Sequence, residues 1–441
     1  MGRLGIETRS SLSMHLSEHG ALPTPAPRHG KTPGRLVAEL ERSGLRGRGG
    51  GWFPAFRKWN AVVDSSVERG RLGRTRHPVV IANGMEGEPA SAKVAVLMAS
   101  SAHLIFDGIS AAAATIGATD AFLALHRDSN LLPILTKALD ERHAAGIDAL
   151  PISLVTPPAR YVASEESALS HWVGEGIATP VYPDRPFQKG AAGRPTLVQN
   201  VETLSHVALI ARHGGDWYRQ VGVPSAPGTT LVTIGGAVQE EGVVEVPTGT
   251  PVRDIIALAG GLTEPVRGYL TGGYGGGWVA ADGFDSTAWD PDAMRDAGAV
   301  IGASVLWLVG ESECPLNEIA RVTAWMAGES AGQCGPCIYG LPSISDDVHH
   351  LAMRHMNDSE MKRLEQRLKL VQNRGGCKHP DGTARFVATG LKAFADEVAL
   401  HLDRRCSAPL GRPVSRPGTE GSLPVPAPRL ALVDISGRDF E

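Results

Sequence analysis

The sequence is poor in cysteine, in basic excess and in long apolar runs. Its 441 residues include five cysteines, an odd and low number that argues against a disulfide framework and favours a reducing cytoplasm. Lys and Arg total 43 against 47 Asp and Glu, so the basic excess of a nucleic-acid-binding protein is missing. The N-terminal residues lack the continuous apolar segment of a secretory signal.

The most apolar long stretch is AHLIFDGISAAAATIGATDAFLAL, at residues 102–125, and it is interrupted by Asp107 and Asp120. A membrane-spanning helix needs about 20 predominantly apolar residues. This stretch therefore predicts a buried helix followed by a strand, and no direct insertion into a membrane.

The pattern of apolar and polar residues changes along the chain, which predicts several hydrophobic cores. Residues 35–225 alternate short apolar strands with helical patterns, as a layered α/β domain with a parallel sheet does. Residues 226–302 read as a small β-grasp module, and residues 303–405 carry four amphipathic patterns that predict an all-α helical bundle. Residues 1–34 and 406–441 are rich in Pro, Gly and Ser and predict flexible tails.

A glycine-rich loop stands out near the start of the first region. The string LRGRGGGWFPAFRKW, at residues 45–59, has four glycines between residues 47 and 51, followed by Pro54. Such glycines leave backbone amides open to an anion, and Pro54 suits the first turn of a helix. A phosphate at this helix start and a tight structural turn are both compatible with the pattern alone.

This loop and four later strings resemble the family of NADH-oxidising flavoprotein subunits found in respiratory complex I and in NAD-linked hydrogenases and formate dehydrogenases. The family's loop reads GLRGRGGAGFP, and here GLRGRGGGWFP is followed by Lys58 and Trp59. The later strings, in the family's order, are NGMEGEP (83–89), YVASEESAL (161–169), GRPTLVQNVETL (193–204) and ESAGQCGPCIYG (329–340). The resemblance covers residues 35–405 and implies an FMN-binding α/β domain, a soluble-ligand-binding β-grasp domain and an iron–sulfur helical bundle.

The resemblance also implies roles for particular residues. Glu86 and Glu166 are expected near the nicotinamide of NADH as catalytic residues. The expected FMN- or nucleotide-binding residues are Gly47, Arg48, Gly49, Gly50, Phe53, Lys58, Asn83, Tyr161, Glu165, Gln199, Asn200 and Thr203. Read without the family, the paired glutamates could be an acidic helix start, and the QNVET string a helix capped by Asn200.

Several positions depart from the family's pattern. Trp52 stands where the family has glycine, Met85 where it has aspartate beside the flavin, and Ser164 where it has glycine. Asp184 occupies the place of a lysine that would meet a nucleotide phosphate, although Arg185 or Lys189 could compensate. The FMN assignment is therefore better founded in the sequence than the NADH assignment.

The iron–sulfur motif lacks one cysteine. The resemblance assigns Cys334, Cys337 and Cys377 as metal ligands, whereas Ala331 replaces the first cysteine of the family's C-x-x-C-x-x-C. The open position could be filled by water or an external ligand, or by a histidine such as His379. The site could also be [3Fe–4S] rather than [4Fe–4S], hold zinc, or hold no metal. Cys314 is expected to be a buried small residue and Cys406 a bystander.

These observations predict a cytoplasmic oxidoreductase subunit that binds FMN and an iron–sulfur cluster. It would pass electrons from NADH to a redox partner protein, ferredoxin-like or another iron–sulfur subunit. The alternative is a non-catalytic relative, serving in assembly or electron wiring, whose cysteine site holds zinc or is empty. Met85, Asp184 and Ala331 motivate that alternative.

Overall fold

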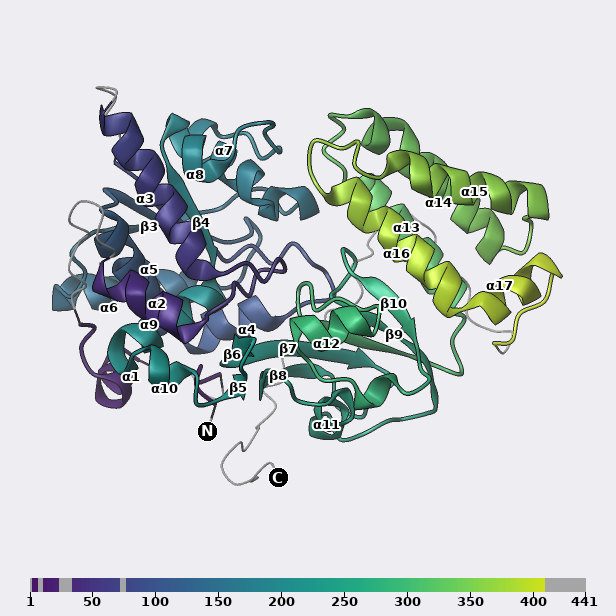
Figure 1. Cartoon of the computed structure of the whole chain (residues 1–441), viewed down its shortest axis with the longest axis horizontal. Helices are drawn as coiled ribbons and strands as arrows, with labels where there is room; N and C mark the ends of the chain where they lie inside the picture. Colours follow the sequence, from purple (N-terminus) through teal and green to yellow (C-terminus); the bar gives the residue numbers. More distant parts are fainter. Residues whose placement is uncertain (1, 7–10, 24–33, 72–76, 409–441) are drawn as a thin grey trace.

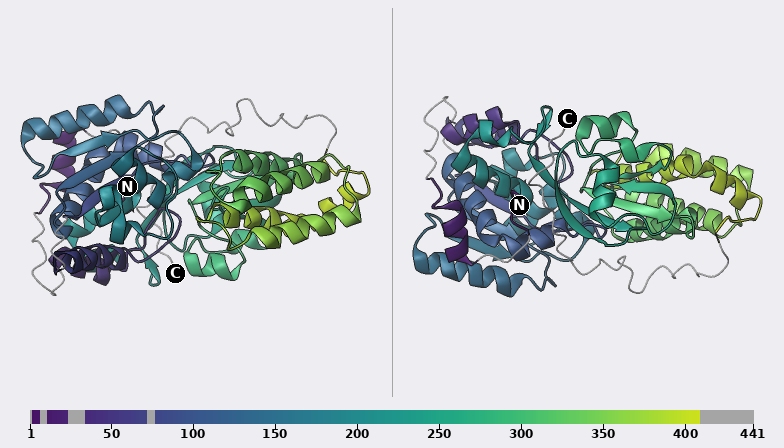
Figure 2. Two further views of the ribbon diagram at one scale, coloured as in Figure 1. Left: turned by 90° about the horizontal axis from the view of Figure 1, so that it is seen from above. Right: turned by 90° about the horizontal axis from the view of Figure 1, so that it is seen from below.

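The protein forms an elongated arrangement of two sheets and a helical region, seen in Figure 1 from purple through green to yellow. It is described by a computed structural model over residues 2–6, 11–23, 34–71 and 77–408. The two views of Figure 2 place the α/β region at one end of the molecule and the helical region at the other.

The first sheet is parallel and has four strands in the order β3-β2-β1-β4. They are β1 (Val79–Asn83), β2 (Asp120–Ala124), β3 (Ile152–Val155) and β4 (Thr196–Asn200). The chain therefore runs outward from β1 through β2 to β3 and then returns to the other side of β1. Strand order reverses between β1 and β4, and in open α/β sheets a ligand crevice forms at such a switch point.

Helices cover this sheet and supply most of the largest core. They are α2 (Arg35–Ser43), α3 (Ala55–Arg71), α4 (Lys93–Ser100), α5 (Ala102–Ile116), α6 (Leu132–Ala145), α7 (Glu166–Glu175), α8 (Pro186–Lys189), α9 (Val201–His213) and α10 (Gly215–Tyr218), with 3₁₀ turns η1 (Tyr161–Ser164) and η2 (Ala191–Gly193). Helix α5 is almost wholly buried, as its apolar sequence predicts. Its Asp107 is paired with Arg142, Arg212 and His15, so the charge that interrupts the apolar stretch is matched inside the core.

The second sheet has five strands in the order β10-β9-β11-β7-β8. They are β7 (Thr229–Gly236), β8 (Gly242–Pro247), β9 (Val266–Thr271), β10 (Gly277–Ala280) and β11 (Val305–Gly310), accompanied by α11 (Val252–Leu258), η3 (Phe284–Ser286) and α12 (Pro291–Asp296). A two-residue pair, β5 (Gly222–Val223) and β6 (Ala226–Pro227), precedes it. Strand β11 comes from the segment that the sequence assigned to the helical bundle, because a short apolar run such as VLWLVG fits a buried strand or a helix equally well.

The helical region begins at Pro315. It comprises α13 (Pro315–Gly328), the π-helical turn η4 (Pro336–Gly340), α14 (Leu341–Ala352), α15 (Asp358–Val371), α16 (His379–Ala393) and α17 (Ala395–Leu402). The last pattern was expected as one helix over residues 389–405. Instead α16 starts ten residues earlier and the helical backbone breaks at Phe394, whose φ is −117° and ψ 40°.

Part of the N-terminal segment is packed, contrary to the expectation of a flexible tail over residues 1–34. Helix α1 (Leu12–His19) lies beside α5 and α6, and Leu4 and Ile6 belong to the main core. The backbone amides of Arg3 and Leu4 both donate to the buried carboxylate of Glu245 on β8. The expected C-terminal tail, apart from residues 406–408, lies outside the described residues.

Within the described ranges, no single helix is long and apolar enough to cross a membrane. The pair α4 and α5 reaches the required length and composition together, with a bend of 95° between them.

Candidate functional site

A cavity of about 380 Å³ opens at the switch point of the first sheet. Asn83 and Asn200 end β1 and β4, and they are paired in register across those two strands. Both line the cavity, together with Arg48, Gly49, Gly50, Met85, Glu86, Gly87, Glu88, Ser91, Lys93, Val94, Tyr161, Ser164, Gly272, Gly275, Val300, Gly302, Ala303 and Arg385. Its wall thus comes from the first sheet, the second sheet and the helical region.

The glycine loop forms one wall, and its backbone is suited to an anion. Among the described residues, no hydrogen-bond partner is found for the amides of Gly49 and Gly50. A Cβ atom at position 49 would lie 3.1 Å from the Cβ atom of Asn200, so the loop approaches β4 as closely as glycine allows. Free amides on a closely packed loop fit a phosphate group.

Arg48 holds this loop rather than lining the cavity with its charge. Its buried guanidinium donates to the carbonyl oxygens of Thr229 and Pro227, and its backbone amide donates to Oγ1 of Thr203 at 2.8 Å. The guanidinium carbon also lies 4.3 Å from the ring centre of Trp52.

Trp52 explains one departure from the family's loop. Its φ is +46°, the left-handed conformation that glycine adopts without strain. A tryptophan there costs about 1 kcal/mol or more in backbone energy. Only 7% of its surface is exposed, and its packing in the core around β7 and β8 offsets that cost.

Glu86 and Lys93 are both tied to the first turn of α4. Oε1 of Glu86 accepts from Oγ of Ser91 and from the amide of Val94, and Oε2 accepts from the amide of Ala95. Burial nevertheless raises the pKa of Glu86. The buried Lys93 ammonium donates to the carbonyl of Arg48 at 2.7 Å and also pairs with the buried carboxylate of Glu202 at 2.8 Å, so it lies beside the glycine loop with its charge matched.

Glu88 faces the second sheet from the opposite wall. Its carboxylate accepts from the amides of Ala90 and Tyr274, yet burial raises its pKa to about 8. It therefore remains largely protonated at neutral pH.

The second sheet and α16 approach the cavity at Tyr161. A Cβ atom on Gly275 would lie 2.7 Å from the Tyr161 hydroxyl. Arg385 of α16 reaches the carbonyl oxygen of Gly276 at 3.1 Å. The cavity is therefore narrow where these three elements meet.

Half of the fourteen expected FMN and NADH residues line the cavity: Arg48, Gly49, Gly50, Asn83, Glu86, Tyr161 and Asn200. The others lie outside the lining: Gly47, Phe53, Lys58, Glu165, Glu166, Gln199 and Thr203. Asn200 also caps α9 and Glu165 caps α7, so the helix-capping interpretations of both strings are confirmed. Glu166 forms an ion pair with Lys58, and Phe53 is 52% exposed.

The structure also defines the surroundings of Gln199, Met85 and Ser164. Oε1 of Gln199 is buried without a hydrogen-bond partner among the described residues. Met85 is 5% exposed and packs in a small core under the cavity, and Ser164 donates to the carbonyl of Tyr161. The side-chain amide of Asn83 donates to the backbone carbonyl of Ser164, and this hydrogen bond connects η1 to the end of β1.

The nucleotide-phosphate positions lie away from this cavity. Asp184 and Lys189 form an ion pair at 2.7 Å and line a second cavity of about 130 Å³ with residues of α7 and η2. Lys189 is therefore already matched by the acidic residue that replaces the family's lysine.

The expected metal-binding cysteines gather on the other side of Tyr161. Burial, and then Cys334, raise the pKa of Cys337 to about 12, and burial also raises that of Cys377, to which Glu165 and Cys334 add. The three sulfurs do not all lie within 4.8 Å of one another.

His379 follows Cys377 by two residues and has one ring nitrogen without a partner in the described part of the chain. Its Nε2 lies 2.9 Å from the carbonyl oxygen of Met326, which can only accept, so Nδ1 carries the lone pair. That Nδ1 is buried and has no partner in the described part of the chain. The tyrosine ring of Tyr161 is 5.4 Å away, between the cavity and this group.

Sequence reasoning missed Glu88, Lys93, Arg385 and the second-sheet glycines of the cavity wall. Glu88 lies inside the quoted NGMEGEP string, and Lys93 follows it by four residues, so both could have been proposed from proximity. Gly275 and Arg385 are more than 180 residues further on, and no local pattern assigns them.

Comparison with known proteins matches three parts of the chain. Residues 40–209 match the Nuo51 FMN-binding domain, residues 231–273 the SLBB domain, and residues 317–401 the NADH-ubiquinone oxidoreductase-F iron-sulfur binding region. The chain is 27% identical over 390 residues to a subunit of the NADH-quinone oxidoreductase of Rhizobium meliloti, covering 85% of this chain and 90% of the relative. It is 25% identical to HndC of the NADP-reducing hydrogenase of Solidesulfovibrio fructosivorans, covering 86% and 78%.

The fold is also similar to that of a solved chain of an NAD⁺-reducing [NiFe]-hydrogenase in the H₂-reduced state. The TM-score is 0.75 at 27% identity, over 83% of this chain, and the match spans 62% of the hydrogenase chain's length. The chain thus carries an FMN-binding domain and an iron–sulfur binding region that match those of the flavoprotein subunits of respiratory complex I, and it is similar over most of its length to such subunits and to NAD-linked hydrogenase subunits.

Proposed function

We propose that this chain is a cytoplasmic oxidoreductase subunit that takes electrons from NADH and delivers them to a redox partner. The partner would be ferredoxin-like or another iron–sulfur subunit. The proposal is carried by the adjacency of the cavity and the cysteine group, because Tyr161 lines one and its ring contacts His379 beside the other. Of the expected domain limits, we propose 35–225 unchanged. The boundary between the second and third domains moves from residue 302 to residue 314, because β11 pairs with β7 and β9 and the helical region begins at Pro315.

Bound FMN would supply the change from two-electron to one-electron chemistry. The chain's own residues would bind the FMN and orient it. The amides of Gly49 and Gly50, with the Lys93 ammonium nearby, would hold the phosphate, while Asn83 and Asn200 would meet the ring system at the strand ends. Glu86 is held on α4 with its carboxylate fixed by three donors, so it can present a fixed acidic edge to a nicotinamide.

The cysteine group would hold an iron–sulfur cluster through Cys334, Cys337 and Cys377. Nδ1 of His379 is the protein atom best suited to the position that Ala331 leaves open, because its partner nitrogen is already fixed. A histidine at that corner would make the cluster easier to reduce than one held by four thiolates.

Anaerobic stopped-flow mixing of the flavin-loaded protein with NADH tests the proposal. We expect the flavin absorption to bleach with NADH, and cluster signals to appear afterwards in electron paramagnetic resonance spectra. A flavin that stays oxidised with both NADH and NADPH would overturn the proposal and establish the non-catalytic alternative. Glu86→Gln and Glu166→Gln then compare an acid of the cavity wall with one outside it, and we expect the larger loss of bleaching rate from Glu86→Gln.

A further inference from the structure

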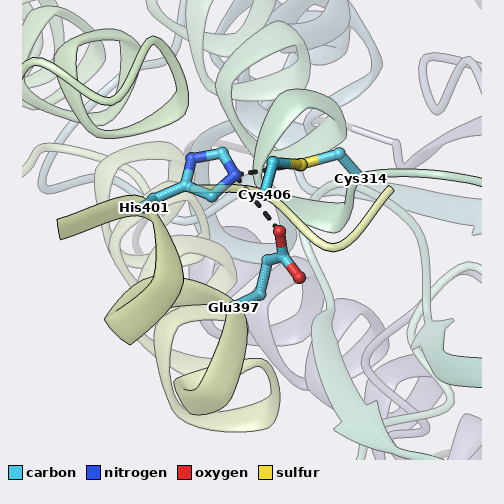
Figure 3. Close-up of side chains that lie close together, drawn as sticks. All are labelled: Cys314, Glu397, His401 and Cys406. Carbon is cyan, nitrogen blue, oxygen red and sulfur yellow. Dashed lines mark hydrogen bonds and ion pairs between the residues drawn. The ribbon is translucent and has the colours of Figure 1, made fainter. Parts of the chain in front are cut away.

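A second group of metal-ligating side chains lies in the helical region, apart from the cavity and from the expected cluster. Cys314, Glu397, His401 and Cys406 each offer one ligand atom, and all four atoms lie within 4.8 Å of one another. In the part of the chain that the structure describes, no other group meets this criterion. Figure 3 shows the four side chains converging on one point.

The four residues come from three segments. Cys314 is the N-cap residue of α13, while Glu397 and His401 are one turn apart on α17 and share a face. Cys406 follows α17 after a turn. Cys314, Glu397 and His401 are no more than 8% exposed, so the group is enclosed on most sides.

The hydrogen bonds around the group leave three lone pairs facing one another. Nδ1 of His401 lies 3.0 Å from the carbonyl oxygen of Leu351, which can only accept, so in the neutral ring Nε2 carries the lone pair. That Nε2 is 3.2 Å from Oε1 of Glu397 and 3.4 Å from Sγ of Cys314. The carboxylate of Glu397 also accepts hydrogen bonds from the backbone amide and the hydroxyl of Ser407.

A cation bound by all four side chains would account for lone pairs that face one another. For zinc bound at about 2.3 Å to sulfur and about 2.0 Å to nitrogen or oxygen, tetrahedral angles separate neighbouring ligand atoms by about 3.3 to 3.8 Å. The two distances from Nε2 are close to that range. Two thiolates and an imidazole favour zinc over magnesium or calcium, which prefer oxygen ligands.

The surroundings hold the ligands as they are held around known metal sites. The Leu351 carbonyl fixes the tautomer of His401, and Arg267 of β9 binds Oε2 of Glu397 at 3.1 Å, leaving Oε1 turned toward the histidine. With two thiolates, one carboxylate and a divalent ion, the site would carry one negative charge, which the Arg267 guanidinium balances.

We propose that Cys314, Glu397, His401 and Cys406 form a structural zinc site that fastens α17 and the segment after it to the start of α13. Cys314 is buried, as expected, and under this proposal Cys406 would not be a bystander. The chief alternative is a Cys314–Cys406 disulfide, but both cysteines are free in this structure.

The first experiment is zinc analysis with X-ray absorption spectroscopy on the full-length protein, purified anaerobically with its thiols reduced. We expect one zinc per chain with two sulfur and two nitrogen or oxygen neighbours. A shell of three sulfurs would place the zinc at Cys334, Cys337 and Cys377 and overturn the proposal. So would protein that remains free of zinc after zinc is supplied, or an intact mass that reveals a disulfide.

Variants locate the metal independently. The zinc should be lost from a Cys314→Ser, Cys406→Ser double variant and kept by the matched Cys334→Ser, Cys337→Ser, Cys377→Ser triple variant. Cobalt titration of Glu397→Gln should show an affinity lowered at least about tenfold. Zinc that is retained by the double variant contradicts the assignment. If that variant does not fold, the sulfur count in the parent protein still decides.

Discussion

The cavity is formed mainly by backbone atoms, whereas the cysteine group depends on side-chain atoms. This difference decides how each tolerates sequence change. The cavity is formed largely by backbone amides, strand ends and the close approach of glycines. It keeps its shape although Trp52, Met85 and Ser164 depart from the family's pattern. The cysteine group depends on single sulfur atoms, so the one change at Ala331 removes a ligand outright.

The largest expected effect is on the cavity, from Gly49→Val. A Cβ atom there would already be 3.1 Å from the Cβ atom of Asn200, and a branched side chain would fill the space over the loop amides. We expect flavin binding to be abolished while iron is retained. The matched control is Gly51→Val, because a Cβ atom at position 51 meets nothing within 4 Å. Bound flavin, quantified after denaturation, checks this, and a folded Gly49→Val protein with full flavin would contradict the phosphate assignment.

Cys377→Ser should have the opposite effect to Gly49→Val, with iron lost and flavin kept. Only Cys334 and Cys337 would then remain as thiolate ligands, so we expect most of the bound iron to be lost and the flavin to remain. Cys406→Ser is the control, because Cys406 is similarly half-buried but belongs to the other group. Iron and acid-labile sulfide analysis measures the result. Equal iron in both variants would show that Cys377 is not a ligand.

Ala331→Cys should shift the properties of the cluster without adding or removing a cofactor. A fourth thiolate adds negative charge, so we expect a reduction potential lower by about 100 mV or more and slower conversion to [3Fe–4S]. Ala331→Ser supplies a similar volume without the thiolate. Redox titration followed by electron paramagnetic resonance distinguishes them, and identical potentials in all three proteins would mean that residue 331 faces away from the cluster.

The smallest expected effect is the pH dependence of stability from Glu88. Its pKa is raised from 4.5 to about 8, so between those values the folded protein keeps a proton that the unfolded chain releases. The free energy of unfolding should therefore fall as pH rises from about 4.5 to 8, by up to about 5 kcal/mol at about 1.4 kcal/mol per pKa unit. Glu88→Gln should flatten this fall, and the exposed Glu311→Gln should not. Urea unfolding across this pH range provides the measurement; parallel curves for Glu88→Gln and the parent would refute the assignment.

The fold was largely predictable where each element carries its own pattern. Strands β1, β2, β3, β7 and β8 and helices α13, α14 and α15 follow from local periodicity and turn residues, whereas β4 was not predicted as a strand. The break at Phe394 and the early start of α16 did not follow from these patterns, because the apolar face continues through the break. The packed N-terminus was missed because Leu4 and Ile6 are held by distant partners such as Glu245, which no local pattern identifies.

The site was predictable as far as contiguous strings reach. Asn83, Glu86 and the loop glycines were found because each lies in a string that one element positions. Lys58 and Glu166 were expected in the same site, but they satisfy each other outside the lining. The group formed by Cys314 and Cys406 was overlooked because no motif relates two cysteines so far apart in the sequence, and only the packing of α17 against α13 brings them together.

The hydrogen bonds that Arg48 donates to the second sheet affect how the protein unfolds. Its guanidinium binds the carbonyls of Pro227 and Thr229, while its own amide and carbonyl are held by Thr203 and Lys93. The loop can keep its shape only while β7 stays docked, so a nucleotide held there would favour the docked state by mass action. Calorimetry should then record the two sheets melting as one cooperative unit when flavin is bound, and separating into two transitions when it is stripped away.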